Sequence, residues 1–214
     1  MTAPNDSVDV TEGSGTSMGA HQKNSVYHQT FIQVDENGDI AGTNKKYYVF
    51  VPKQAPAADN VYFDVFNNGT NKKLLLLSCK AIFSGAAAET GALSVDLFLQ
   101  RTSTVGTGGT TASEDNSTIT NMSITNHNSG NSVTSGVTGR LDPSGGATAA
   151  GNMSWCSLFT EETNAGSYVE KEMVHPDAPP EFPNGTGFRV VQGSEANTEG
   201  QVGFWAVLEE QDIA

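Results

Sequence analysis

The sequence predicts an all-β protein, specifically a β-sandwich of jelly-roll type with a flexible N-terminal arm. Three observations support this fold: about eight strand-like segments, scarcely any candidate helix, and turns rich in Gly and Asn. Residues 161–174 are the one candidate helix, and Gly166 within them disfavours even a short one. At 214 residues the chain is long enough to bury the core of one such domain.

The first 25 residues differ from the rest in being small and polar. Their large aliphatic side chains are Val8, Val10 and Met18, too few to offset the entropy lost when a chain orders. We therefore expect residues 1–25 to form an extended or disordered arm and residues 26–214 to form the β-sandwich. Such an arm can become ordered when it lies across a neighbouring subunit.

Apolar alternation predicts the strands in order along the chain. Residues 26–34 come first, and residues 47–51 follow, ended by Pro52 because proline cannot donate to a strand ladder. Residues 61–66 and 74–83 flank an Asn- and Gly-rich turn, which predicts strand, tight turn, strand. Further strands are predicted over residues 93–99, 153–159, 187–192 and 202–208.

Two stretches between these strands are less regular. Residues 102–152 are dominated by Gly, Ser, Thr, Asn and Ala, which predicts weak strands joined by long turns. Residues 173–184 contain four prolines and are expected to form a stiff extended loop. In the last strand Val202, Phe204, Ala206 and Leu208 share one face, and Trp205 and Val207 make the other face apolar too. We expect that second face to be covered, in part by a partner.

Charge excludes one class of partner. The chain has 11 basic and 24 acidic residues, a net charge of −13, which opposes binding to nucleic acid because phosphate contacts need cations. No apolar segment of 18 residues is present to span a membrane, so no membrane partner is expected. The amino terminus lacks the basic start and apolar run of a secretory signal, which predicts synthesis in a cytoplasm.

Motifs for metal or cofactor binding are weak, and no cofactor or metal is predicted. Asp35, Asn37 and Asp39 have the spacing that opens a calcium loop. The pattern then fails, because Ile40 stands where the loop needs Gly and Lys46 stands where it needs Glu. A hairpin turn is the favoured interpretation. The four histidines, His21, His28, His127 and His175, have no neighbouring ligands at a metal spacing.

Catalytic signatures are also missing, so we expect the protein not to be an enzyme. No serine has a Gly-x-Ser-x-Gly elbow, and Cys79 and Cys156 lack a flanking catalytic pattern. The two cysteines are interpreted as small buried hydrophobes, with a disulfide between them as the alternative. The acidic pairs 161–162 and 209–210 are interpreted as solvated charge, because adjacent strand residues point to opposite faces.

Three aromatic residues are candidates for a partner interface: Tyr168, Phe182 and Trp205. Aromatic side chains anchor protein interfaces, and they also stack on sugars. The competing interpretation is that at least two of the three are ordinary core residues.

Four segments resemble virion structural proteins of tailed bacteriophages, of the capsid decoration or cement type. The likeness extends over residues 60–208 and leaves the arm unmatched. It is carried by the strand and turn segments 61–67, 91–102, 155–166 and 185–193. The resemblance implies a capsid-associated decoration or cement protein, or another head or tail accessory, and no enzymatic activity.

The residues and the resemblance together predict a protein that works by adhesion. It is expected on the surface of the virion, made in the cytoplasm of a bacterial host, bridging neighbouring major capsid protein subunits and contacting copies of itself as a homotrimer or homodimer. Apolar burial at such contacts contributes about 25 cal/mol per Å². The alternative function is a carbohydrate- or receptor-binding module at the virion surface or tail, because such modules share the sandwich fold.

Overall fold

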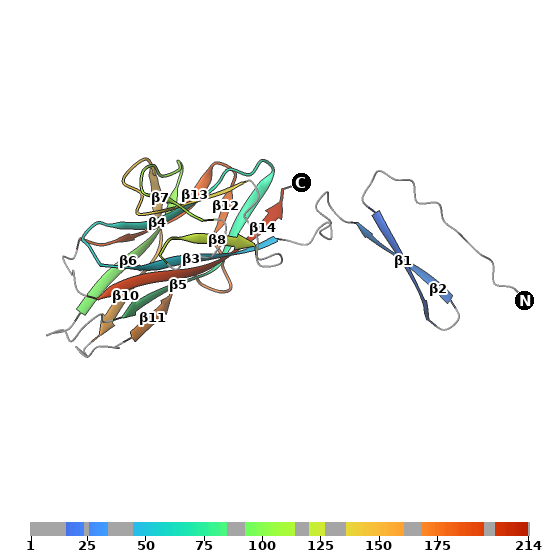
Figure 1. Ribbon diagram of the computed structural model, residues 1–214, viewed down its shortest axis with the longest axis horizontal. Helices are drawn as coiled ribbons and strands as arrows, with labels where there is room; N and C mark the ends of the chain where they lie inside the picture. Colours follow the sequence, from blue (N-terminus) through green and yellow to red (C-terminus); the bar gives the residue numbers. More distant parts are fainter. Residues whose placement is uncertain are drawn as a thin grey trace, which may run out of the picture. The chain divides into compact units, whose positions relative to one another are not determined.

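The computed structural model describes residues 16–23, 26–33, 45–84, 93–113, 120–126, 136–160, 168–194 and 200–213 (Figure 1). Within these ranges every regular element is a strand, which confirms the predicted all-β class. The chain divides into two compact units, Met1–Thr43 and Asn44–Ala214. The sandwich was predicted to begin at residue 26, whereas residues 26–33 belong to the first of these units.

The first unit contains an antiparallel pair of strands. They are β1 (Thr16–Lys23) and β2 (Val26–Gln33), and the register sets Met18 opposite Phe31. β2 matches the predicted strand over residues 26–34. β1 lies in the segment that was expected to be an extended or disordered arm, and the acidic turn at residues 35–39 lies outside the described residues.

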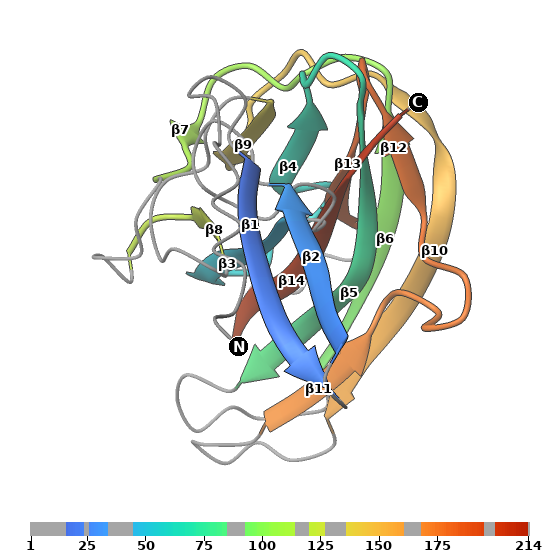
Figure 2. The ribbon, with the colours of Figure 1, turned by 90° about the vertical axis from the view of Figure 1, so that its right-hand side faces the viewer.

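The second unit is a sandwich of two antiparallel sheets packed against each other (Figures 1 and 2). We name each sheet after one of its strands. The β6 sheet has the order β10-β6-β13-β4-β9-β7, and the β5 sheet has the order β11-β5-β14-β3-β8 with β12 also paired to β5. The β-sandwich prediction is confirmed.

Successive strands cross repeatedly from one sheet to the other. The β6 sheet contains β4 (Val61–Asn67), β6 (Leu93–Thr102), β7 (Thr110–Thr111), β9 (Val137–Leu141), β10 (Ala149–Thr160) and β13 (Thr186–Gln192). The β5 sheet contains β3 (Lys45–Gln54), β5 (Lys72–Ser84), β8 (Ser123–Asn126), β11 (Tyr168–Glu172), β12 (Glu181–Pro183) and β14 (Gln201–Asp212).

Aromatic rings fill the core between the sheets. Phe204 of β14 lies 5.2 Å from both Tyr62 and Phe63 of β4, measured between ring centroids. Phe188 of β13 packs edge-on against Phe63 at 6.0 Å. Each such fully buried side chain contributes roughly 1.5–3 kcal/mol through removal of apolar surface from water. The core therefore ties the β5 sheet to the β6 sheet.

The predicted order of strand, tight turn and strand is confirmed for β4 and β5, but the two strands do not pair with each other because they belong to different sheets. The turn between them is a corner held by buried Asn67. Its Nδ2 donates to the carbonyls of Lys72 and Phe182, each at 2.9 Å, and its Oδ1 accepts from the Gly69 amide at 2.9 Å. Local sequence shows a tight turn, but it does not reveal which sheet the chain enters afterwards.

The prediction that Pro52 ends this strand is wrong, because β3 continues to Gln54. The register of β3 with β14 shifts here, so that Pro52 and Lys53 lie opposite the single residue Gly203. A bulge of this kind tolerates proline because the ladder is already interrupted.

Two further elements differ from or refine the sequence prediction. Tyr168–Glu172, part of the candidate helix, forms strand β11; the preceding residues 161–167 lie outside the described residues. Residues 102–152 hold the short strands β7, β8 and β9, which confirms weak strands joined by turns.

Candidate interaction surfaces

The three predicted interface residues do not come together. Phe182 is fully buried, because β12 pairs with β5 and sets its ring toward the core. The ring lies 5.1 Å from that of Phe188 and beneath the guanidinium of Arg101 at 4.9 Å. The interpretation of Phe182 as an interface residue is therefore corrected to a core residue. Tyr168, 59% exposed on edge strand β11, and Trp205, 37% exposed, do face outward.

Trp205 belongs to an apolar surface on the outer side of the β5 sheet. Along β14, Phe204 and Ala206 are buried while Trp205 faces away from the core. The indole stacks on Tyr48 of β3, with 5.4 Å between centroids and 29° between planes. Phe50 lies directly opposite Trp205 in the strand register. We define the Trp205 face as the outward residues Tyr48, Phe50, Ile82, Trp205 and Val207.

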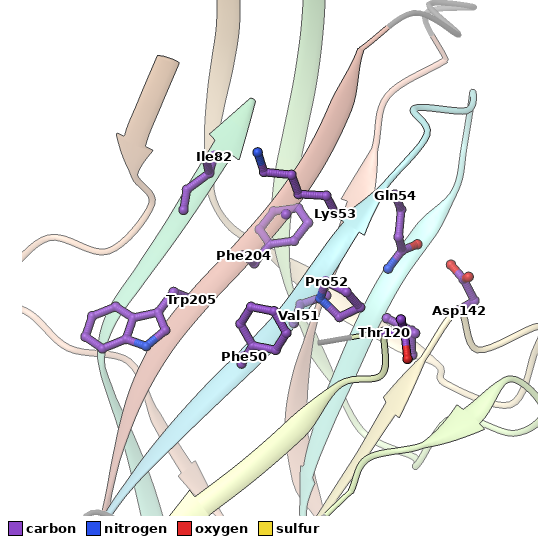
Figure 3. Close-up of a pocket in the computed structure, with 12 residues that line it drawn as sticks. Phe50, Val51, Pro52, Lys53, Gln54, Ile82, Thr120, Asp142, Phe204 and Trp205 are labelled. Carbon is purple, nitrogen blue, oxygen red and sulfur yellow. The ribbon is translucent and has the colours of Figure 1, made fainter. Parts of the chain in front are cut away.

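A groove of about 870 Å³ opens beside Trp205 on this face (Figure 3). Gly203 lines it, and a Cβ there would lie 3.1 Å from Lys53 Cγ, so glycine lets the bulge of β3 pack closely against β14. Trp205 and Phe50 lie toward one end, and Gln54 and Asp142 lie toward the other. The groove can accept an apolar group at its aromatic end and hydrogen-bonding groups at its polar end.

Ion pairs surround the Trp205 face. On the outer side of the β5 sheet, Lys46 Nζ lies 3.9 Å from Glu209 and Lys80 Nζ lies 3.4 Å from Glu170. The contact between Lys73 Nζ and a Glu181 oxygen is 3.2 Å. Exposed pairs of this kind stabilise a fold by about 0–1 kcal/mol each. Their arrangement around an apolar centre has the anatomy of a protein interface, with an apolar core and a polar rim.

A second exposed apolar cluster lies on the outer side of the β6 sheet. Trp155 is 64% exposed and Phe159 is 49% exposed, both on edge strand β10, while Leu158 between them is buried. Phe98 of β6 lies opposite Trp155 and is half-buried. We call Phe98, Trp155 and Phe159 the Trp155 patch. Sequence alternation placed the two exposed residues on one face, but it did not predict that the face is open.

Strict alternation along the predicted strand 153–159 would place Met153 on the same face as Trp155 and Phe159, and the structure differs. The register shifts between Asn152 and Ser154, so Met153 is an extra residue that packs against the core. The bulge reverses the alternation at this point, and Trp155 then faces outward.

Another part of the outer β6 sheet is covered by its own loops. Buried Asp64 of β4 accepts a hydrogen bond of 2.6 Å from the Gly106 amide through Oδ2. Arg140 and Arg189 lie opposite Asp64 on the two neighbouring strands and donate to the carbonyls of Gly108 and Ala147, both at 3.1 Å. We call residues 103–109 and 142–148 the cover loops.

Burial raises the pKa of the Asp64 carboxyl. The Gly106 hydrogen bond and the positive charges of Arg140 and Arg189 act in the opposite direction without cancelling it. A Cβ added to Gly106 would lie 2.1 Å from Asp64 Oδ2, so the close approach of this loop requires glycine. Asp64 is buried, the two arginines are half-buried, and together they fasten the cover loops to the sheet.

The two cysteines are free thiols, so the alternative of a disulfide between them is not realised in this structure. Cys79 is fully buried in the core, and burial raises its thiol pKa far above the ordinary value. Burial also raises the pKa of Cys156 to about 11. Because the thiolate is the reactive form, neither residue is poised as a nucleophile at neutral pH.

The described residues hold neither a metal-binding cluster nor a membrane-spanning helix. Among them, no three His, Cys, Asp or Glu side chains gather in a way that could hold a metal ion. The same residues include no helix of the length and apolarity needed to cross a membrane. His175, one of the scattered histidines, is exposed and accepts from the Asp177 amide at 3.3 Å.

Comparison of the chain with protein-family models, curated proteins and solved structures finds no match. The sandwich has an open apolar cluster on the outer side of each sheet.

Proposed function

We propose that the protein is a virion structural protein that decorates a capsid and ties neighbouring capsid subunits together. The observation that carries this proposal is the pair of exposed aromatic clusters, the Trp155 patch and the Trp205 face, on the outer sides of the two sheets. A protein that bridges others needs two contact surfaces, and a sandwich places them on opposite sides of one rigid core.

Exposed aromatic clusters favour contact with other proteins. Large apolar patches on a folded protein mark interaction surfaces, because leaving them in water is unfavourable. Removing apolar surface from water contributes about 25 cal/mol per Å², and a specific interface buries about 800 Å² on each partner. Trp155 and Phe159 have the residue types that most often carry binding energy at the centre of an interface.

We assign the contact with the major capsid protein to the Trp155 patch. It contains the most exposed of the large apolar side chains among the described residues, Trp155 at 64%. It also lies at β10, an edge strand of 12 residues, which can contact a partner through its backbone as well as its side chains. Burial of this patch against the shell would leave the Trp205 face on the opposite side of the sandwich.

The proposal is tested by adding the purified protein to shells that lack it and measuring bound protein by cosedimentation. We expect saturable binding and a higher temperature of shell disruption. Trp155→Glu should weaken binding by at least tenfold, which corresponds to about 1.4 kcal/mol. A matched control is Ile213→Glu, because Ile213 is also an exposed apolar residue, at 44%, and lies outside both clusters. Equal binding of wild type and Trp155→Glu would contradict the assignment, and absence of binding by wild type would contradict the function.

A second candidate function is supported by the groove beside Trp205. Aromatic rings next to side chains such as Gln54 and Asp142 are a common arrangement for stacking and hydrogen bonding to a sugar. This candidate is a carbohydrate- or receptor-binding module at the virion surface or tail. A glycan array on which the protein binds a defined sugar, together with no effect on shells, would favour it over decoration.

A further inference from the structure

We infer that the Trp205 face binds a second copy of this chain, face to face about a two-fold axis. The inference deepens the proposed function, since two copies joined in this way would each present a Trp155 patch to a different capsid subunit. It concerns the isolated protein and can be tested without a shell.

The shape of the Trp205 face suits contact with itself. In a two-fold interface the same patch serves both subunits, so the patch must contain both a projecting group and a hollow that receives it. The exposed indole of Trp205 stacks on Tyr48, and the groove lined by Gly203 opens directly beside it. An aromatic anchor that enters an apolar pocket is the commonest form of a binding hot spot.

Charge permits a second copy at this face, and the groove beside Trp205 distinguishes it from the outer side of the β6 sheet. The six strands of the β5 sheet hold seven of the eleven basic residues and six of the 24 acidic ones, a net charge of +1 in a chain of net −13. The β6 sheet, with three basic and two acidic residues, is also at +1, so the acidic excess lies outside both sheets. Two copies that met through those acidic segments would repel each other. At the β5 sheet this repulsion is absent.

The rim of the face is self-complementary as well. Lysines and glutamates alternate around it, as in the pairs of Lys46 with Glu209 and of Lys80 with Glu170. Because each copy presents both signs, a lysine of one copy can approach a glutamate of the other. A partner of strongly negative or strongly positive charge would match only half of this rim.

The main test is the self-association of the purified full-length chain, measured by sedimentation velocity over a wide concentration range. We expect a monomer–dimer equilibrium for wild type. Trp205→Glu should weaken dimer formation by at least tenfold, because it sets a charge at the centre of the apolar face. Trp155→Glu is the matched control, since it makes the same change at the other exposed tryptophan and should leave the dimer intact.

A second variant tests the charge argument without removing an aromatic residue. The double change Lys46→Glu and Lys80→Glu replaces two exposed lysines, so it should leave the monomer folded. It makes the rim acidic, and we expect dimerisation to weaken several-fold at low salt and to recover in part at high salt. A dimer as tight as that of wild type at low salt would contradict the charge argument.

Fluorescence reports on the face directly. The chain has two tryptophans, so Trp155→Phe leaves Trp205 as the single emitter. Its emission should move to shorter wavelength as the protein is concentrated through the range in which dimers form, because the indole leaves water.

Three outcomes would overturn the inference: a wild-type chain that stays monomeric at every concentration, a dimer lost in Trp155→Glu and kept in Trp205→Glu, or a sugar bound at the groove by a monomer. The proposed function fails by a different result, the absence of wild-type binding to shells. A dimer that does not bind shells would therefore refute the function alone, and a monomer that binds them would refute the inference alone.

Discussion

The outer sides of the two sheets differ in whether other parts of the chain cover them. Around Asp64 the β6 sheet is covered by segments of its own chain. The cover loops donate a hydrogen bond to Asp64 and accept hydrogen bonds from Arg140 and Arg189. The β5 sheet leaves Trp205 exposed, with a groove beside it. One region holds its charged groups with hydrogen bonds to its own loops, although Asp64 Oδ1 and Arg140 Nε have no hydrogen-bond partner among the described residues. The other region leaves apolar groups in water.

The difference distinguishes a surface that is covered by the protein's own loops from an apolar surface that is left open. A buried carboxyl such as Asp64 is costly without partners, and a cover loop supplies one for Oδ2. An exposed aromatic cluster is also unfavourable, but nothing in the described residues covers the Trp205 face. We therefore regard the covered region as structural and the open one as a binding surface. The following experiments test that contrast, from the largest expected effect to the smallest.

Replacing neighbouring aromatics on β14 separates the inner and outer sides of the β5 sheet. Phe204→Ala should lower the free energy of unfolding by about 3–5 kcal/mol, because it leaves a cavity between Tyr62 and Phe63. Trp205→Ala should cost the monomer about 1 kcal/mol, mostly from the lost stacking on Tyr48. Urea unfolding at dilute concentration measures both. Equal losses would show that Trp205 is part of the monomer's core.

Removing the Asp64 carboxyl tests the covered region. Asp64→Ala should cost about 1–3 kcal/mol, because the buried Gly106 amide loses its acceptor. Asp64→Asn keeps an oxygen acceptor and should stay within about 1 kcal/mol of wild type. Hydrogen exchange at Gly106 should become faster in the alanine variant and stay slow in the asparagine variant. Slow exchange in both variants would mean that the loop is held by other contacts.

The pH dependence of stability tests the same group by another route. Because the pKa of Asp64 is raised in the folded state, the folded protein holds this proton more tightly than the unfolded chain does. Its contribution is therefore fully present below the unfolded pKa, about 3.9, and is lost as the pH rises through the folded pKa. Relative to Asp64→Asn, wild type should lose stability as the pH rises above about 4. The opposite trend would indicate that the arginines outweigh burial.

Thiol labelling should show the smallest effect, a difference in reactivity between buried Cys79 and half-buried Cys156. Cys79 belongs to β5, its side chain is buried in the core, and it should not react in the folded protein at neutral pH. Cys156 is half-buried with a pKa raised to about 11, and should react slowly, faster as the pH rises toward that value. Both should react fully in denaturant. Fast labelling of Cys79 would show that the sheet opens in the native state.

Much of the fold could be predicted from alternation alone. The strict pattern at Val95, Leu97 and Leu99 matches a half-buried strand, and all three side chains are buried. Pairing could not be predicted, because a local pattern does not specify which sheet a strand joins, as β4 and β5 demonstrate. Bulges were also missed: those at Pro52 and Met153 change which side chains face the core without any local signal.

The candidate surfaces were predicted only in part. Trp205 was identified because the last strand is apolar on both faces, and the core can cover one face alone. Its outward placement agrees with that pattern. Phe182 was misplaced because its proline-rich surroundings suggested an exposed loop, whereas β12 carries it into the core. The covered region was not predicted, because Asp64 and Gly106 are 42 residues apart and no motif links them.

The most direct test of the account is an electron cryomicroscopy map of shells incubated with this protein. We predict that the sandwich lies on the outer surface with the Trp155 patch against a capsid subunit, and that a second copy covers the Trp205 face. A map in which both aromatic clusters of the bound sandwich face solvent would contradict the claim that the protein works by adhesion through them.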